Sequence, residues 1–281
     1  MPRVCSPRTL CLVLWMSVAL GLSAAAQQPA PPAATSARAM APFDPTGVWV
    51  SVVTEDWRWR MVTPGKGDVL GIPVNAQGLK IANAWDYAKD VAAGNACKAY
   101  GAGGIMRMPT RLRIGWQDDN TLKVETDAGQ QTKLLLFDAS RKPSGPPTLQ
   151  GHAVAEWIDV LTRGGGRGMR GAAGAGRGDG RGAPYGTGAI RVVTTNLLDG
   201  YLRKNGVPYS SNAIVTEYFD RVPGPDRAEW LVVKTTVEDA TYLNQPYLTS
   251  AHFMLEPDGS KWRPSPCEID PPLLPTRPAV R

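Results

Sequence analysis

Two polar residues of this chain lie on apolar, alternating stretches where acid–base chemistry could be built. Glu217 lies between Val215 and Phe219 on one face of a predicted strand, and a carboxylate there is costly unless it is paired. His152 lies on another predicted strand, which could bring it to Glu217. A histidine–carboxylate pair is a competent general base near neutral pH, and Tyr218 would supply the acid. These three residues are the predicted catalytic set if the protein is an enzyme.

Each of these residues has a structural alternative. His152 could be an ordinary barrel residue that is hydrogen-bonded to the backbone. Glu156 shares the strand face of His152, but it lies about 13 Å along the strand, too far for contact. Glu217 could form a buried ion pair that sets strand register without any activity. The basic residues considered for that pair are Arg107, Arg111, Arg113 and Arg191.

Tryptophan is abundant, with nine residues in the chain. An aromatic-lined cavity would suit a small apolar, ring-containing or sugar ligand. The predicted ligand-binding residues are Trp49, Trp157, Phe219 and Glu156. Packing in the core is the alternative use of the same aromatic side chains.

Sequence motifs for bound cofactors are absent. The chain has no Walker sequence, dinucleotide-binding fingerprint, Gly-x-Ser-x-Gly elbow or His-Glu-x-x-His. A metal site is not predicted either, because His152 and His252 are the only histidines and no Cys/His cluster exists. The sequence therefore predicts no cofactor and no metal, and it indicates neither a classical hydrolase nor a nucleotide-dependent enzyme.

The N-terminus is typical of an exported protein. Residues 1–27 read as a cleaved signal peptide, with basic residues, a short apolar run and small residues for cleavage. Residues 28–41 are a Pro- and Ala-rich flexible linker, and 42–268 form a single predicted domain. Within that domain, 163–188 is so rich in Gly and Arg that it predicts a disordered loop, and 269–281 is an extended tail.

Cysteine usage agrees with export to the periplasm or beyond. Of four cysteines, Cys5 and Cys11 leave with the signal peptide. Cys97 and Cys267 remain, and an even pair in an exported protein predicts a disulfide bond.

Charge and hydropathy limit the partners. The net charge of +6 comes largely from arginines of the signal peptide and of the Gly/Arg-rich segment, so we expect no nucleic-acid binding. The apolar run of the signal peptide is too short for a membrane span, and no other stretch approaches that length, so no stable membrane insertion is expected. The oligomeric state stays open.

Period-two alternation dominates the body of the chain and predicts a mostly β fold. About eight to nine strands follow one another with short polar turns, which is typical of an antiparallel up-and-down barrel. The first strand is predicted over 43–53, with Gly47 and Trp49 in its Gly-x-Trp motif, and it is expected to extend to about residue 62 after a kink. One amphipathic helix is predicted over 76–93, with Asn75 as its N-cap.

Several short motifs carry a resemblance to known proteins. Gly47-Val48-Trp49 resembles the Gly-x-Trp start of lipocalin-type barrels, although the inserted helix departs from the usual lipocalin order. The strands 151–157 (Gly-His-Ala-Val-Ala-Glu-Trp) and 215–219 (Val-Thr-Glu-Tyr-Phe), followed by an acidic pair at 238–239, are similar to a widespread, functionally uncharacterised group of exported bacterial proteins. The resemblance implies an exported β-rich domain and no particular reaction.

Three functions remain open from the sequence. The leading hypothesis is an exported, lipocalin-like protein that binds a small apolar or aromatic molecule, with His152 and Glu217 as polar anchors. The second is a cofactor-independent lyase, isomerase or cyclase in the same pocket. The third is a structural or interaction module of the cell envelope, for which a solid core and an exposed apolar patch are expected.

Overall fold

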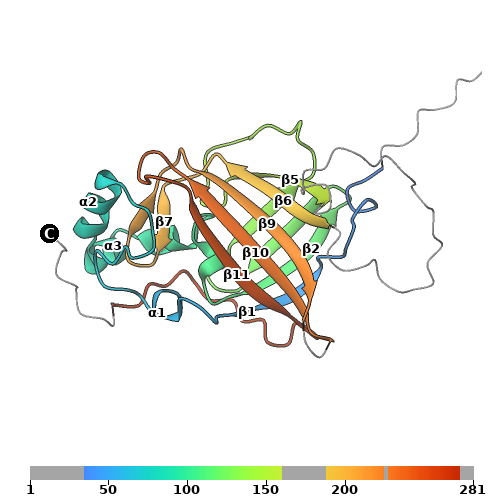
Figure 1. Ribbon diagram of the computed structural model, residues 1–281, viewed down its shortest axis with the longest axis horizontal. Coiled ribbons are helices and arrows are strands. Elements are labelled where there is room, and N and C mark those ends of the chain that lie inside the picture. Colours follow the sequence, from blue (N-terminus) through green and yellow to red (C-terminus); the bar gives the residue numbers. More distant parts are fainter. Residues whose placement is uncertain (1–34, 160–187, 225–226, 273–281) are drawn as a thin grey trace, which may run out of the picture. The chain divides into compact units, whose positions relative to one another are not determined.

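A computed structural model describes residues 35–159, 188–224 and 227–272 of the chain. The predicted signal peptide, half of the linker, nearly all of the Gly/Arg-rich segment and most of the tail lie outside the described residues. The described part is mostly β, and nine strands close into a barrel, which confirms the predicted fold class (Figure 1). No helix among the described residues is long and apolar enough to cross a membrane.

The barrel strands follow the spatial order β1-β11-β10-β9-β6-β5-β4-β3-β2 and close on β1. Two further strands, β7 (Gly200–Arg203) and β8 (Val207–Tyr209), form a separate hairpin. In the sequence this hairpin lies between β6 and β9. The bounds of the barrel strands are β1 Gly47–Val52, β2 Arg111–Asp118, β3 Thr121–Thr126, β4 Thr132–Leu136, β5 His152–Asp159, β6 Gly188–Thr195, β9 Ile214–Pro223, β10 Glu229–Glu238 and β11 Tyr247–Glu256.

One neighbouring pair, β4 and β5, is parallel, whereas the up-and-down scheme predicts antiparallel pairs throughout. The reason is geometric, because a closed ring of nine strands cannot alternate direction at every step. The connection 137–151 returns the chain to the end of the barrel where β4 began, so β5 runs in the same direction as β4. The parallel pairing is short, with Leu135 opposite Ala153 and Leu136 opposite Val154.

The helical segment and the first strand each differ from the prediction. The predicted helix is two helices, α2 (Ala76–Ala84) and α3 (Tyr87–Ala92), because the backbone leaves the helical conformation at Trp85 and is extended at Asp86. Asn75 caps α2 as predicted, and Asp86 caps α3 by accepting a hydrogen bond from the Lys89 amide at 3.0 Å. The first strand ends at Val52 rather than near residue 62, and the remaining elements are α1 (Trp57–Arg60) and the 3₁₀ helices η1 (Asn95–Tyr100) and η2 (Ile105–Arg107).

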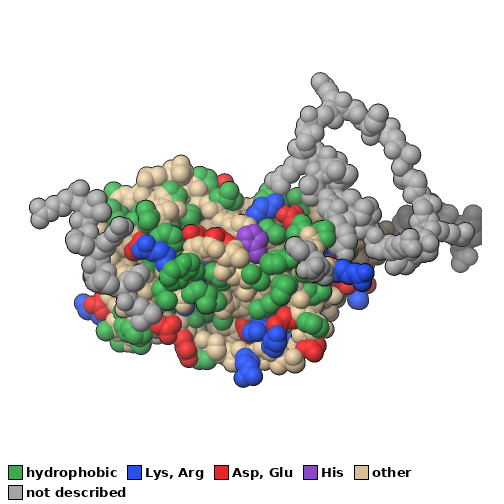
Figure 2. Space-filling view, turned by 60° about the horizontal axis from the view of Figure 1, so that its bottom comes forward, with side chains coloured by type: hydrophobic (Ala, Val, Ile, Leu, Met, Phe, Trp, Pro, Cys, Tyr) green, Lys and Arg blue, Asp and Glu red, His purple; other side chains and the backbone are tan. Residues whose placement is uncertain are grey.

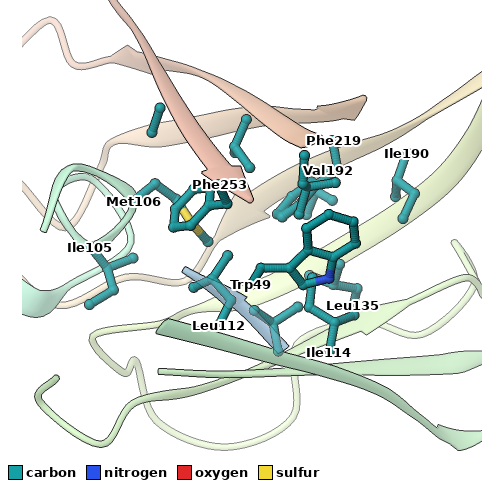
Figure 3. Close-up of a cluster of buried hydrophobic side chains, with 14 of the residues drawn as sticks. Trp49, Ile105, Met106, Leu112, Ile114, Leu135, Ile190, Val192, Phe219 and Phe253 are labelled. Carbon is teal, nitrogen blue, oxygen red and sulfur yellow. The ribbon is translucent and has the colours of Figure 1, made fainter. Parts of the chain in front are cut away.

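Alternate residues of the strands fill the barrel interior. Trp49, Leu135, Phe219 and Phe253 come from four different strands and gather in one cluster (Figure 3). The indole of Trp49 is fully buried, and its Nε1 donates to the Pro45 carbonyl at 3.1 Å, so its polar atom is satisfied inside the core. Burial of such side chains contributes about 2–3 kcal/mol each and is the main source of stability.

The predicted disulfide is present. Cys97 on η1 is bonded to Cys267, which follows β11, across a separation of 170 residues. The bond ties the helical segment to the C-terminal part of the described chain. Tyr100, on the same 3₁₀ helix, donates to the Glu268 carbonyl at 2.8 Å and strengthens the same junction.

Candidate functional site

Glu217 projects into the barrel, between Val215 and Phe219, and is fully buried. Its partner is Lys133 of β4, whose side chain is 3% exposed. The pair is therefore a buried ion pair, as the structural alternative expects, but with a lysine that sequence reasoning did not consider. One carboxylate oxygen, Oε1, has no hydrogen-bond partner among the described residues, and neither has the hydroxyl of its cross-strand neighbour Thr235.

The structure separates the other predicted catalytic residues from Glu217. His152 is half-buried on the outer face of β5, while its neighbour Ala153 is buried inward. Its Nε2 lies 2.8 Å from the Arg141 carbonyl oxygen. Because adjacent strand residues point to opposite faces, Tyr218 also lies outside when Glu217 lies inside. The predicted triad of His152, Glu217 and Tyr218 is thus divided by the barrel wall.

The predicted ligand-binding residues are mainly part of the packing. Trp49 and Phe219 are buried in the barrel core. Trp157 stacks on Phe137 with ring centroids 5.0 Å apart, and its Nε1 donates to the Ala37 carbonyl at 2.8 Å. Glu156 is exposed and pairs with Arg191 at 2.7 Å. None of these four residues lines either of the two pockets described below.

A different set of residues lines a pocket of about 280 Å³ beside α1 and the start of β11. None of them was predicted to lie in a ligand site, and Arg107 was considered only as a possible ion-pair partner of Glu217. We call it the arginine pocket, and the lining residues used below are Glu55, Trp59, Arg107, Arg203, Tyr247 and His252. They come from α1 and the segment before it, from η2, from β7 and from β11, so four separate parts of the chain build the site.

Arg203 is the most unusual of these residues because it is a buried cation, 7% exposed. Its guanidinium donates to the Leu70 carbonyl at 2.7 Å and stacks on the Trp59 ring with its carbon 4.8 Å from the centroid. Burial lowers the pKa of Arg203, and a hydrogen bond with Tyr247 and the charge of Asp68 oppose that shift. Among the described residues, no carboxylate forms an ion pair with Arg203.

The segment that accepts from Arg203 is itself fixed. Asn205 is fully buried and its side-chain amide donates to the carbonyls of Gly65 and Asp68, at 2.8 and 3.0 Å. The Asp68 carboxylate accepts from the Trp59 indole at 3.1 Å. Arg203 therefore sits on a rigid support, which is the arrangement that favours a specific anion site over a mobile surface charge.

The remaining charges of the pocket are matched. Asp56 pairs with Arg107 at 2.7 Å, and Glu55 pairs with the buried Arg60 at 2.7 Å. Burial raises the pKa of Glu55, but a hydrogen bond from Thr54 and the nearby charges of Arg60, His252 and Arg107 together hold that pKa below its usual value. Since these charges cancel, the uncompensated positive charge of the pocket belongs to Arg203.

His252 adds a second feature to this site. Its Nδ1 lies 3.6 Å from Glu55 Oε2. A histidine beside a fixed carboxylate is the pair that the sequence predicts for His152 and Glu217, and the structure places it here with other residues. No signal in the sequence indicated this pair, because the run 55–60, Glu-Asp-Trp-Arg-Trp-Arg, alternates in the way expected of a continuing first strand.

The face of the molecule in Figure 2 carries acidic and basic side chains near one another, with hydrophobic side chains between them.

Comparison with protein-family models, with curated proteins and with solved structures finds no match to this chain. The resemblance to exported barrel proteins stays a prediction. Among the described residues, no group of three or more His, Cys, Asp or Glu side chains is placed to hold a metal ion.

Proposed function

We propose that the protein is an exported β-barrel that binds a small organic anion in the arginine pocket. The observation that carries this proposal is Arg203, a buried and rigidly held cation that lines a pocket and has no carboxylate partner among the described residues. Export is supported by the signal-like residues 1–27 and by the disulfide of Cys97 and Cys267.

The ligand class follows from the lining of the pocket. A guanidinium prefers a carboxylate, which it can bind through two parallel hydrogen bonds. Leu70 and Leu248 add apolar surface, so the ligand has a short apolar body as well as its acid group. The volume of about 280 Å³ suits a molecule of benzoate size rather than a long lipid. The binder hypothesis is thus kept, but its site moves from the barrel interior to the arginine pocket.

Calorimetric titration tests the proposal with matched pairs of ligands. Small aromatic and aliphatic carboxylates, such as benzoate and hexanoate, are compared with their uncharged amides. We expect the acids to bind at least tenfold more tightly than the amides, which is a difference of about 1.4 kcal/mol. Arg203→Met should remove this preference, whereas Arg263→Met removes an exposed charge outside the pocket and serves as the control.

Native mass spectrometry of protein from its own periplasm complements the titration. A co-purifying acid that is lost in Arg203→Met would identify the natural ligand. Equal affinity for acids and amides, or an unchanged affinity in Arg203→Met, would contradict the proposal. In that case the remaining hypothesis is a structural or interaction module of the cell envelope.

The pair of His252 and Glu55 favours a second candidate function, a cofactor-independent lyase, isomerase or cyclase. His252 would abstract a proton next to the bound acid group, with Glu55 orienting the imidazole at 3.6 Å. Arg203 and Arg107 would stabilise the negative charge that develops. The test is exchange of α-protons of a bound acid in D₂O, followed by NMR. Loss of exchange in His252→Gln with binding retained would support the enzyme, and no exchange in the wild type would leave the binder.

A further inference from the structure

The barrel wall opens between β4 and β5. The two strands pair only at Leu135 with Ala153 and at Leu136 with Val154. Before these positions, residues 132–134 of β4 and the segment 148–151 have no such pairing with each other, and they line a pocket of about 540 Å³ together with part of the loop 141–144. We call this pocket the wall opening.

Lys133 lies at the inner side of the wall opening. It is among the residues that line the pocket, yet its side chain is only 3% exposed, and its amine pairs with Glu217 inside the barrel. The Oε1 atom of Glu217 and the hydroxyl of Thr235 have no hydrogen-bond partner among the described residues. Unsatisfied polar atoms in a core are costly, and a bound polar molecule is one way to satisfy them.

We propose that Lys133 forms a Schiff base with a small carbonyl compound that enters through the wall opening. Lysine amines form such bonds with aldehydes and ketones when a neighbouring group can handle the protons. Glu217 is in contact with the amine and is the only carboxylate of the described residues that pairs with it. The barrel interior excludes bulk water, which protects an imine from hydrolysis.

The bonds and charges of this step balance without any other reactant. The ammonium of Lys133 passes one proton to the Glu217 carboxylate, and the neutral amine adds to the carbonyl carbon. Glu217 then returns that proton to the carbonyl oxygen, which becomes a hydroxyl group. Glu217 next takes a second proton from the nitrogen and delivers it to that hydroxyl, so the C–O bond breaks, one water molecule departs and a C=N bond forms. The product is a protonated imine beside a carboxylate. Because the positive charge stays at Nζ, Glu217 is never left as a buried charge without a partner.

The rim of the wall opening indicates which carbonyl compounds fit. Arg141, Lys142 and His152 lie among the lining residues, and no carboxylate does. The described lining is therefore basic and polar, which favours an aldehyde or ketone that also carries an acid group. The proposal does not depend on the arginine pocket, since the two pockets share none of their lining residues.

Reductive trapping tests the proposal on the full chain. The probe is 4-formylbenzoate with cyanoborohydride, followed by peptide mass spectrometry to map the modified lysines. We expect Lys133 to be labelled at least tenfold more than the exposed Lys142 at the rim. The neutral analogue 4-formylbenzamide should label Lys133 several-fold less.

Two variants sharpen the result. Lys133→Arg keeps the charge opposite Glu217 but cannot form an imine, so the specific label should disappear. Lys142→Arg should retain it, and Arg203→Met should retain it as well. The mapping in the wild type does not depend on any variant folding. Labelling of Lys142 and other exposed lysines without Lys133 would overturn the proposal, and equal labelling by the two aldehydes would overturn the choice of an acidic ligand.

Discussion

Lys133 and Glu217 form an ion pair inside the barrel although they are 84 residues apart in the chain. Their strands, β4 and β9, are separated by β5 and β6 in the barrel order, so the pair spans the interior rather than one strand junction. Both side chains are almost fully withdrawn from solvent. The pair therefore links two sides of the barrel and is sensitive to the register of both strands.

The first prediction concerns the stability that this pair contributes. Removing one partner, by Glu217→Gln or Lys133→Met, leaves a buried charge unpaired and should lower the free energy of unfolding by about 3–5 kcal/mol. The double variant Lys133→Met/Glu217→Leu should recover most of that loss because no buried charge remains. Urea unfolding followed by tryptophan fluorescence measures both. Losses that simply add in the double variant would show that the pair is not coupled.

The second prediction concerns the disulfide. Because Cys97 and Cys267 are separated by 170 residues, their bond restricts the unfolded chain strongly. The double variant Cys97→Ser/Cys267→Ser should lose about 5 kcal/mol of unfolding free energy in the chain-entropy model. Reductant should destabilise the wild type by a similar amount and leave the variant unchanged. A wild type that is indifferent to reductant would contradict this prediction.

The third prediction concerns alkaline pH. Burial, together with a hydrogen bond to Asp90 at 2.8 Å, raises the pKa of Tyr201 above its usual value. Since the folded pKa is the higher one, the stabilisation is present below about pH 10 and is lost as the pH rises further. Tyr201→Phe should reduce the slope of unfolding free energy against pH by at most about 1.4 kcal/mol per pH unit above pH 10. An unchanged slope would mean that Tyr201 ionises as freely in the folded protein as in the unfolded chain.

The fourth prediction concerns acid pH and the arginine pocket. The pKa of Glu55 is held below its usual value although burial opposes this, so its stabilisation is present above the ordinary pKa of a glutamate and is lost as the pH falls below it. Glu55→Gln should therefore make the stability of the protein fall less steeply as the pH is lowered. At neutral pH it should also cost about 2 kcal/mol, because Arg60 is 2% exposed and loses its carboxylate partner. Thermal unfolding between pH 3 and pH 7 measures both effects, and Asp119→Asn serves as an exposed control. If the stability of the wild type and that of Glu55→Gln fell equally steeply at acid pH, this role of Glu55 would be contradicted.

Local pattern was enough to predict much of the architecture. Alternation such as that of Val215, Glu217 and Phe219 reports a strand and its two faces, because successive side chains point to opposite sides. The cap at Asn75 and the pairing of Cys97 with Cys267 were likewise predictable, since each depends on residue type and position. The break at Trp85 was not, because helix periodicity continues across it and only the non-helical backbone of Trp85 and Asp86 separates α2 from α3.

The candidate sites show which features could not be predicted from the sequence alone. It determined that Glu217 lies on a buried strand face and needs a partner, but Lys133 became that partner only when the barrel closed. It contained Arg203 and His252 without any sign of their roles, because Trp59, Leu70 and Glu55 reach them only in the folded chain. Periodicity is a property of neighbouring residues, whereas a buried charge and its pocket are properties of distant segments brought together. The tertiary structure alone decided which polar groups were left unmatched, and those groups are where the chemistry is proposed.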